Sequence, residues 1–235
     1  MFLTDHEKER YHRHLIIPEI GEEGQIKIKN AKVLVVGAGG LGSPVLQYLA
    51  AAGVGTIGIV DADEVSISNL QRQILYHEAE VGLSKAETAA QKLGKQNSNV
   101  HFNVYPYFLV EENGTQIIAE YDVVLGCTDN FPSRYLIDEV CKENGIPYVH
   151  GSIAEFEGQV AVFNYRGGPS YRSIFPEIPD GSDLPLGVIG VLPGIIGSMQ
   201  TCEALKIITG TGQVLSGKLL IYDALQASLM KVDLG

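Results

Sequence analysis

The sequence predicts an α/β fold in which helices cover both faces of a mostly parallel, Rossmann-like sheet, extended by C-terminal antiparallel strands. β-branched apolar runs alternate with helix-like segments over residues 31–151, the pattern of a buried parallel sheet. A glycine-rich turn joins the first strand to the first helix, and residues 158–165 begin a two-residue alternation. We therefore expect one domain with an N-terminal helical arm (1–30), a Rossmann part (31–150) and an antiparallel part (151–235).

The N-terminal arm carries a helix-start signal. Thr4 and Glu7 have the spacing of a capping box, in which each side chain accepts a hydrogen bond from the backbone of the other residue. This spacing predicts a helix that runs through residues 10–16. Pro18 and Gly21 then mark its end.

Two arginines of this helix are candidates for contact with a ligand. Arg10 and Arg13 are three residues apart, so they share one face of a helix. They form either a solvated stripe or a pair of guanidinium groups that reach bound phosphates.

The remaining elements follow in order along the chain. We expect parallel strands at 32–37, 56–60, 101–107, 123–127 and 146–151, and antiparallel strands at 158–165, 218–224 and 227–234. Helices are expected at 43–53, 85–93, 112–120 and 133–144. The glycine- and proline-rich segment 166–187 is expected to be a crossover loop.

Composition narrows the class of protein. The chain has 235 residues, of which 45% are hydrophobic, which is enough for a sizeable core. It has no apolar run of about 18 residues and begins with a charged segment, so we expect no membrane association and a cytoplasmic location. The formal net charge of -11 repels a phosphate backbone and argues against nucleic acid as a partner.

The cysteines indicate packing rather than chemistry. Cys127, Cys141 and Cys202 lie far apart and form no Cys-x-x-Cys pair. This spacing argues against a disulfide framework and against a four-thiolate zinc site. We expect all three to be small buried packing residues.

A glycine motif predicts a nucleotide site. Gly37, Gly39 and Gly42 form G-x-G-x-x-G between a strand and a helix, and Asp61 ends the next strand. Glycines there allow phosphates to approach the helix N-terminus, and the carboxylate can accept hydrogen bonds from ribose. The alternatives are a structural glycine turn and, for the ligand, NAD bound by an oxidoreductase.

Residues further along favour ATP over NAD. A triphosphate brings about four negative charges, which cationic side chains and a metal must neutralise. Arg72 and Lys85 can supply positive charge, and Asn69 and Gln71 place hydrogen-bond donors in the loop that holds Arg72. Taken singly, each cation is better explained as a solvated surface charge, which is the usual position of such residues.

Asp129 is the candidate magnesium ligand. It follows the strand at 123–127, at the carboxyl edge where open α/β sheets bind ligands. A carboxylate there can hold Mg²⁺ against phosphates. The alternative is an N-cap for the helix that begins near Pro132.

The sequence closely resembles the ThiF, MoeB and HesA family of adenylyltransferases for thiamine and molybdopterin sulfur-carrier proteins, which are relatives of ubiquitin-activating enzymes. The resemblance spans almost the whole chain and is far more specific than the glycine motif. The matching segments are RYHRHLI, VVGAGGLGSPVLQYLAAAGVG, VDADEVSISNLQRQ, VGLSK, CTDN, GQVAVF and GSMQTCEALKIITG.

The resemblance implies a reaction and a set of site residues. It implies a homodimer in which Arg13 acts in the partner's site with Arg72, Lys85 and Asp129, the last at Mg²⁺. It also implies a small ubiquitin-like carrier protein whose C-terminal Gly-Gly carboxylate is adenylylated by ATP, with residues 151–235 binding the carrier. The implied nucleotide contacts are Gly37, Gly39, Gly40, Gly42, Asp61, Ser68, Asn69, Leu70, Gln71, Arg72, Lys85, Asp129 and Asn130.

At two places the sequence departs from the family pattern, and the properties of the family that depend on those places are not expected here. Relatives often have Cys-x-x-Cys where this chain has Ser170 and Ser173, so we expect no zinc, because hydroxyl groups are poor substitutes for thiolates. The crossover loop has Asp183 near the place where some relatives carry a cysteine. A covalent step there is not expected, and a non-catalytic carrier-binding homologue stays as an alternative.

Overall fold

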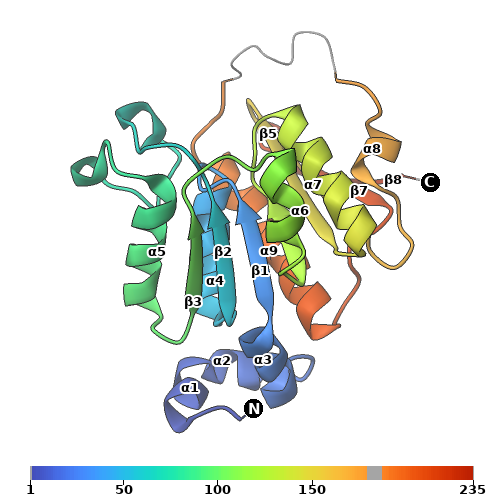
Figure 1. Cartoon of the computed structure of the whole chain (residues 1–235). Helices are drawn as coiled ribbons and strands as arrows, with labels where there is room; N and C mark the ends of the chain where they lie inside the picture. The colour runs from blue at the N-terminus through green and yellow to red at the C-terminus, as the bar shows by residue number, and fades with distance from the viewer. Residues whose placement is uncertain (1, 179–186, 235) are drawn as a thin grey trace.

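The computed structural model describes residues 2–178 and 187–234, which form an eight-stranded sheet in the order β3-β2-β1-β4-β5-β6-β7-β8 (Figure 1). Strands β1 to β5 pair in parallel, and β6 to β8 extend the sheet antiparallel. The predicted fold class is confirmed. The strands are β1 (Lys32–Val36), β2 (Thr56–Val60), β3 (His101–Tyr105), β4 (Val123–Gly126), β5 (Tyr148–Ala154), β6 (Glu157–Phe163), β7 (Lys218–Asp223) and β8 (Ser228–Asp233).

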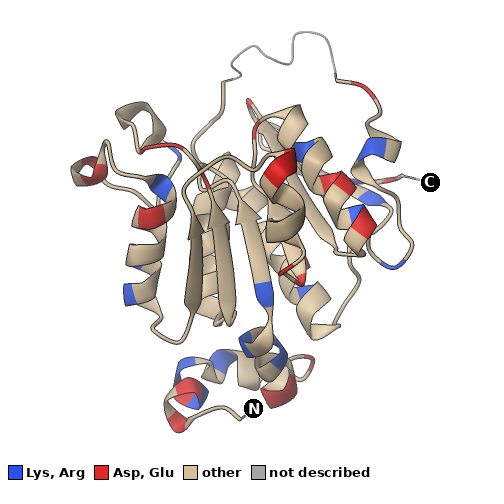
Figure 2. Cartoon of the chain, in the orientation of Figure 1, with Lys and Arg blue, Asp and Glu red and all other residues tan. Residues whose placement is uncertain are grey.

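Helices cover both faces of the sheet, as predicted. One apolar core lies between the sheet and α4 (Gly42–Ala52), α5 (Lys85–Gln96) and α9 (Leu192–Thr209). A second core lies on the opposite face, under α6 (Glu111–Ile118) and α7 (Phe131–Asn144). Charged residues lie mainly on the helices and loops around the sheet (Figure 2). Among the described residues, no helix combines the length and the apolar character needed to span a bilayer.

Helix α9 was not predicted as an element. Its buried side includes polar Gln200, Thr201 and Glu203, while the more exposed side carries apolar residues such as Ile195 and Ile207, so the sequence lacks the one-sided hydrophobic periodicity that marks a surface helix. Its ends did carry signals: Pro193 lies in the first turn, and Gly210 closes the helix at φ +76°.

The predicted crossover loop is only partly a loop. A short helix, α8 (Tyr171–Ile174), lies inside it, because the Ser170 hydroxyl accepts a hydrogen bond from the backbone N–H of Ser173 and caps the turn. Two 3₁₀ turns, η1 (Ile67–Asn69) and η2 (Glu78–Glu80), interrupt the segment after β2. Residues 179–186 lie outside the described part of the chain.

The arm consists of α1 (Asp5–Arg10), α2 (His12–Leu15) and α3 (Gly21–Asn30), so the prediction of one continuous helix through residues 10–16 is wrong. The break is at Tyr11, whose ring is buried against Gly53 and whose hydroxyl accepts a hydrogen bond from Asn97. Anchoring this side chain bends the backbone between α1 and α2. Arg10 and Arg13 therefore belong to different helices.

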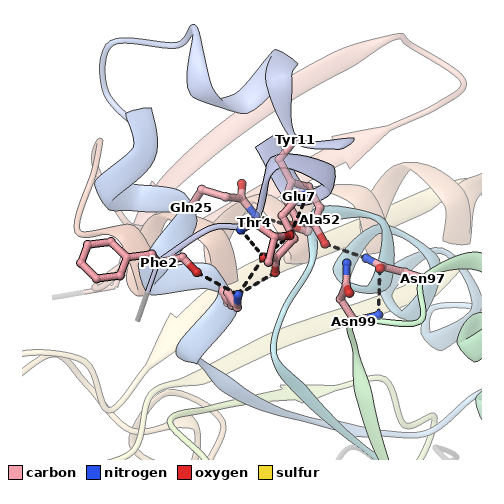
Figure 3. A network of polar contacts seen from close by, with 9 residues as sticks. Phe2, Thr4, Glu7, Tyr11, Gln25, Ala52, Asn97 and Asn99 are labelled. Carbon is pink, nitrogen blue, oxygen red and sulfur yellow. Dashed lines mark hydrogen bonds and ion pairs between the residues drawn. The ribbon is translucent and has the colours of Figure 1, made fainter. Parts of the chain in front are cut away.

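Buried polar contacts fix the arm to the sheet domain (Figure 3). Thr4 and Glu7 form the predicted capping box. Glu7 also pairs with Lys29 at 2.8 Å, and Gln25, fully buried, donates to the carbonyl of Ala52. Because α3 ends two positions before β1 begins, the Gln25–Ala52 and Asn97–Tyr11 hydrogen bonds hold the arm at the end of the sheet where the parallel strands start.

The Glu7 contacts predict a pH-dependent contribution to stability. Burial raises the pKa of Glu7, but hydrogen bonds from Lys29 and Thr4 outweigh it and hold the pKa below its ordinary value of 4.5. Ionised Glu7 therefore stabilises the fold fully above pH 4.5, and this contribution is lost as pH falls through the lowered pKa.

We expect Glu7→Gln to lower the free energy of unfolding by about 1 kcal/mol at pH 7. The difference from the unsubstituted protein should shrink as the pH is lowered below 4.5 in urea titrations. A difference that stayed constant from pH 7 to pH 3 would contradict the assignment.

Candidate active site

The glycine turn between β1 and α4 is confined by backbone on both sides. Gly37 has φ +99°, and a Cβ there would lie 2.5 Å from the carbonyl oxygen of Cys127. A Cβ on Gly42 would lie 2.0 Å from the carbonyl oxygen of Gly37. Only glycine fits either position, and the close approach directs the N-terminus of α4 at the carboxyl edge of the sheet.

Unpaired backbone donors face this edge. In the part of the chain that the structure describes, the N–H groups of Gly39 and Gly40 donate no hydrogen bond to protein. They lie in the turn that leads into α4, next to the N–H groups of its first turn, which have no partner within the helix. Together with the positive end of the helix dipole, they suit an anion such as phosphate.

Asp61 lies beside the turn, as the motif predicts. One carboxylate oxygen accepts from the N–H of Ala38 at 2.7 Å, and the other accepts from the N–H of Asp63 at 2.8 Å. Burial raises the pKa of Asp61, and these two hydrogen bonds and Lys85 only partly offset it. Each oxygen keeps a lone pair that can accept a hydrogen bond from a ribose hydroxyl.

Lys85 is not a solvated surface charge. It is 5% exposed at the start of α5, and its ammonium group pairs with Asp63 at 2.8 Å. The Tyr76 hydroxyl donates to the carbonyls of Ala38, at 2.8 Å, and Lys85, at 3.2 Å. Tyr76 therefore ties the start of α5 to the glycine turn.

Arg72 also lies against the turn. Its Cδ would be 3.7 Å from a Cβ on Gly40, and its guanidinium donates to the carbonyl of Ser68 at 3.3 Å. The side chain is partly buried, with only this weak contact to protein. The guanidinium therefore retains donors for a ligand beside Gly40.

The other loop residues divide between two roles. Asn69 shapes the backbone, because its carbonyl accepts from the N–H groups of Arg72 and Gln73. Gln71 packs on Gly190, where a Cβ would lie 2.1 Å from the carbonyl oxygen of Gln71. Ser68 lies within η1, and Leu70 lies between η1 and Gln71.

Asp129 is not the helix cap. The cap of α7 is Asn130, whose side-chain oxygen accepts from the N–H of Ser133 at 2.9 Å, so the alternative interpretation of Asp129 is wrong. Asp129 is exposed just beyond β4, at the same edge as the glycine turn. A single free carboxylate there fits Mg²⁺, which commonly takes one or two carboxylates together with phosphate and water.

Arg13 does not lie near these residues within one chain. The arm comes before β1, whereas the glycine turn comes directly after it. The two therefore lie at opposite ends of the parallel strands (Figure 1). Arg10 donates to the carbonyl of Gln96, at the far end of α5. Contact between either arginine and a ligand at the glycine turn would therefore need a second copy of the chain.

Sequence reasoning missed a group of unsatisfied polar atoms. In the described residues, the buried side-chain atoms without a hydrogen-bond partner are Gln73 Oε1, Thr128 Oγ1 and Arg134 Nε. Gln73 lies against Gly39, Thr128 lies beside Gly37, and Arg134 donates to the Thr128 carbonyl. Such atoms commonly mark ligand or water sites. The only sequence signal was their place in or beside the two polar loops.

The prediction that all three cysteines are buried packing residues is partly wrong. Cys127 and Cys141 are buried as predicted, and burial raises the pKa of both thiols well above the ordinary value, so neither is an activated nucleophile. Cys202 is exposed on α9, so the prediction that it is a packing residue is wrong. Asp183 lies outside the described residues.

A carboxylate anchors the segment that contains the two serines. Asp138, 1% exposed on α7, accepts from the backbone N–H groups of Tyr171 and Arg172 at 2.8 and 3.0 Å. It also accepts from the Asn164 side chain at 2.9 Å. Ser173 donates from its hydroxyl to the Ser170 carbonyl. Local hydrogen bonds thus hold this segment to α7.

Comparison with known proteins finds relatives that agree with the family predicted from the sequence. The model of the ThiF family matches residues 11–234. A sulfur carrier protein adenylyltransferase of Thermus thermophilus is 48% identical over 97% of this chain and 88% of its own length. A probable molybdopterin-synthase adenylyltransferase of Porphyra purpurea is 48% identical over 94% of this chain. An adenylyltransferase and sulfurtransferase, MOCS3, of Xenopus laevis is 44% identical over 99%. This chain spans 59% and 52% of these two relatives.

Solved structures agree on the fold. Escherichia coli MccB, in a crystal structure with MccA-N7isoASN, superposes with a TM-score of 0.87 at 21% identity over 96% of this chain and 72% of its own. PaaA superposes with a TM-score of 0.83 at 23% identity over 99% of this chain and 75% of its own.

The confinement of the glycine turn predicts the effect of one methyl group. Gly42→Ala should lower the free energy of unfolding by about 3 kcal/mol, because the added Cβ overlaps the Gly37 carbonyl. Gly94→Ala in α5 is the matched control, since nothing lies within 4 Å of its Cβ position. It should stabilise the protein by up to about 1 kcal/mol. Urea denaturation measures both, and equal effects would refute the steric argument.

Proposed function

Because this chain belongs to the ThiF family, we propose that it adenylylates the C-terminal glycine of a small ubiquitin-like sulfur-carrier protein, in the cytoplasm, for thiamine, molybdopterin or related biosynthesis. The Thermus relative is named a sulfur carrier protein adenylyltransferase, and the Porphyra relative is named a probable molybdopterin-synthase adenylyltransferase. The observation that carries the proposal is the convergence of the glycine turn, Arg72 and the buried Lys85 at one edge of the sheet. A dinucleotide would not require such a concentration of positive charge.

The reaction needs charge neutralisation and alignment rather than an enzyme nucleophile. A carboxylate oxygen of the carrier attacks the α-phosphorus of ATP, and the bond from that phosphorus to the bridging oxygen breaks. Pyrophosphate leaves and an acyl-adenylate remains. The attacking oxygen is already ionised, so no general base is required. The buried state of Cys127 and Cys141 is compatible with this chemistry.

Each site residue has a role in this scheme. The N–H groups of the glycine turn and the N-terminus of α4 hold phosphate oxygens, and Asp61 holds ribose. Arg72 and Lys85 neutralise the charge that develops on the phosphates. Asp129 would hold Mg²⁺, which would add positive charge at the phosphate chain when bound.

We further propose that the active form is a homodimer in which Arg13 enters the partner's site. This proposal is supported by the position of the arm, which lies at the end of the sheet opposite the glycine turn, so that Arg13 cannot serve the site of its own chain. A groove of about 530 Å³ between α4 and α9 is lined by the exposed side chains of Tyr48, Ile74 and Val191. It adjoins the Arg72 loop through Ile74, so a second copy seated there would lie next to the nucleotide site.

The carrier is proposed to bind the antiparallel part of the sheet. In the C-terminal hairpin, exposed apolar side chains occur at Leu225, Leu229, Met230 and Val232. Strand β8 is also an edge strand of the described sheet. An exposed apolar surface of this kind is typical of protein interfaces. It lies in the same sheet as β5, which pairs in parallel with β4, and β4 ends two positions before Thr128.

The metal assignment predicts loss of turnover from one substitution. In Asp129→Asn, carrier-dependent exchange of labelled pyrophosphate into ATP should fall by about 100-fold, because the carboxylate ligand for Mg²⁺ is lost. Glu112→Gln, an exposed change on α6, should leave exchange unaltered. The carrier can be identified as a small Gly-Gly-terminated protein that co-purifies with the enzyme. Full exchange by Asp129→Asn would refute the assignment, and carrier binding without exchange in the unsubstituted protein would favour a non-catalytic homologue.

The shared site predicts complementation between inactive subunits. Arg13→Ala and Lys85→Ala proteins should each be inactive alone. After mixing and subunit exchange, about a quarter of the activity should return, because half of the dimers are mixed and each has one intact site. Mixing Arg72→Ala with Lys85→Ala is the control and should recover nothing. Absence of recovery in the first mixture, with exchange verified by mass spectrometry, would exclude the shared site.

A further inference from the structure

Arg134 is a positive charge without an acidic partner in the described part of the chain. It is half-buried near the start of α7, and its guanidinium takes part in none of the ion pairs among those residues. The guanidinium carbon lies 5.0 Å from the centre of the Phe131 ring, and Nε is buried without a hydrogen-bond partner. Burying a cation without an ion pair lowers stability, so packing alone does not explain this position.

The guanidinium holds the turn that contains Asp129. It donates to the carbonyl of Thr128 at 3.3 Å, and Thr128 directly precedes Asp129. Other bonds fix the turn on either side, since the N–H of Cys127 donates to the last carbonyl of β1 at 2.8 Å and Asn130 caps α7. Arg134 therefore contacts the backbone immediately beside the exposed Asp129 carboxylate.

A second arginine beside α7 shows the more ordinary arrangement. Arg172 lies 4.1 Å from the centre of the Tyr135 ring and pairs with Glu139 at 2.6 Å. It is exposed, and both contacts are with α7 itself rather than with the turn before it. Arg134 has a similar aromatic contact, but it bonds a backbone carbonyl where Arg172 pairs with a carboxylate.

We propose that Arg134 is a positioning residue, which acts through the Thr128 carbonyl to fix the direction of the Asp129 side chain. The proposal rests on the proposed function, in which Asp129 holds Mg²⁺. A guanidinium suits this task, because its planar donors and its packing on Phe131 fix the direction of the bond. Groups that orient a metal ligand commonly change metal affinity tenfold or more when they are removed.

A comparison of two forms of ATP separates this role from a structural one. In Arg134→Met, the affinity for magnesium ATP measured by calorimetry should fall about tenfold, whereas the affinity for metal-free ATP should not change. Arg134→Lys, which keeps the charge and a donor, should show a smaller loss of the same kind and repeats the test if Arg134→Met does not fold. Arg172→Met is the matched control and should leave both affinities unaltered.

A double-mutant cycle tests whether Arg134 acts through Asp129. Once Asp129→Asn has removed the carboxylate, adding Arg134→Met should cause no further loss of affinity for magnesium ATP, because no metal ligand is left to orient. If the two substitutions lower the affinity independently, their effects will add, and the proposal is overturned.

The remaining outcomes decide against Arg134 or against the site itself. Unchanged affinity for magnesium ATP in Arg134→Met overturns the proposal. An equal loss for magnesium ATP and metal-free ATP also overturns it, because the residue would then support the fold of the site and not the metal ligand. If the unsubstituted protein binds no ATP, or binds it no better with Mg²⁺ than without, the proposed function or its metal assignment is refuted instead.

Discussion

The close contact of backbone with backbone at the glycine turn is the constraint on which the site depends. Gly37 lies against the carbonyl of Cys127 at the end of β4, and Gly42 lies against the carbonyl of Gly37. These contacts bring α4, β1 and β4 together without intervening side chains, so the helix N-terminus opens directly onto the sheet edge. Asp61 and Tyr76 bond the same turn through Ala38. Any shift of the turn would displace Asp61, the unpaired N–H groups and Lys85 together, and with them the proposed ribose and phosphate contacts.

Electrostatics explains how an acidic chain can hold a polyanion. The net charge of -11 would repel a triphosphate at long range, but the field within the site depends on a few groups at short distance. Lys85 is held in place by Asp63, and Arg72 retains donors beside Gly40. In the proposed site these groups are oriented before the ligand arrives, so little reorganisation would be needed when charge develops on the phosphates. Such local preorganisation outweighs the overall sign of the surface.

The sequence predicted the sheet, most of its helices and the position of Asp61, because periodicity and the glycine motif are local signals. It could not choose between alternatives that depend on distant contacts. Asp129 and Asn130 are both good caps, and only the structure shows that Asn130 caps α7. Burial of Lys85 and the break at Tyr11 likewise arise from tertiary packing against residues far along the chain. Helix α9 was missed because its buried side carries polar residues and its more exposed side apolar ones, which removes the amphipathic pattern from the sequence.

The hold of Asp138 on residues 164–172 has a consequence for the robustness of the protein. A carboxylate that accepts from backbone N–H groups and from Asn164 contains nothing that a chelator can strip or that peroxide can oxidise. Thiolate-metal clasps are vulnerable to both. The geometry of this surface segment is therefore independent of trace-element supply and of the redox state of its surroundings, and only loss of the fold would release it.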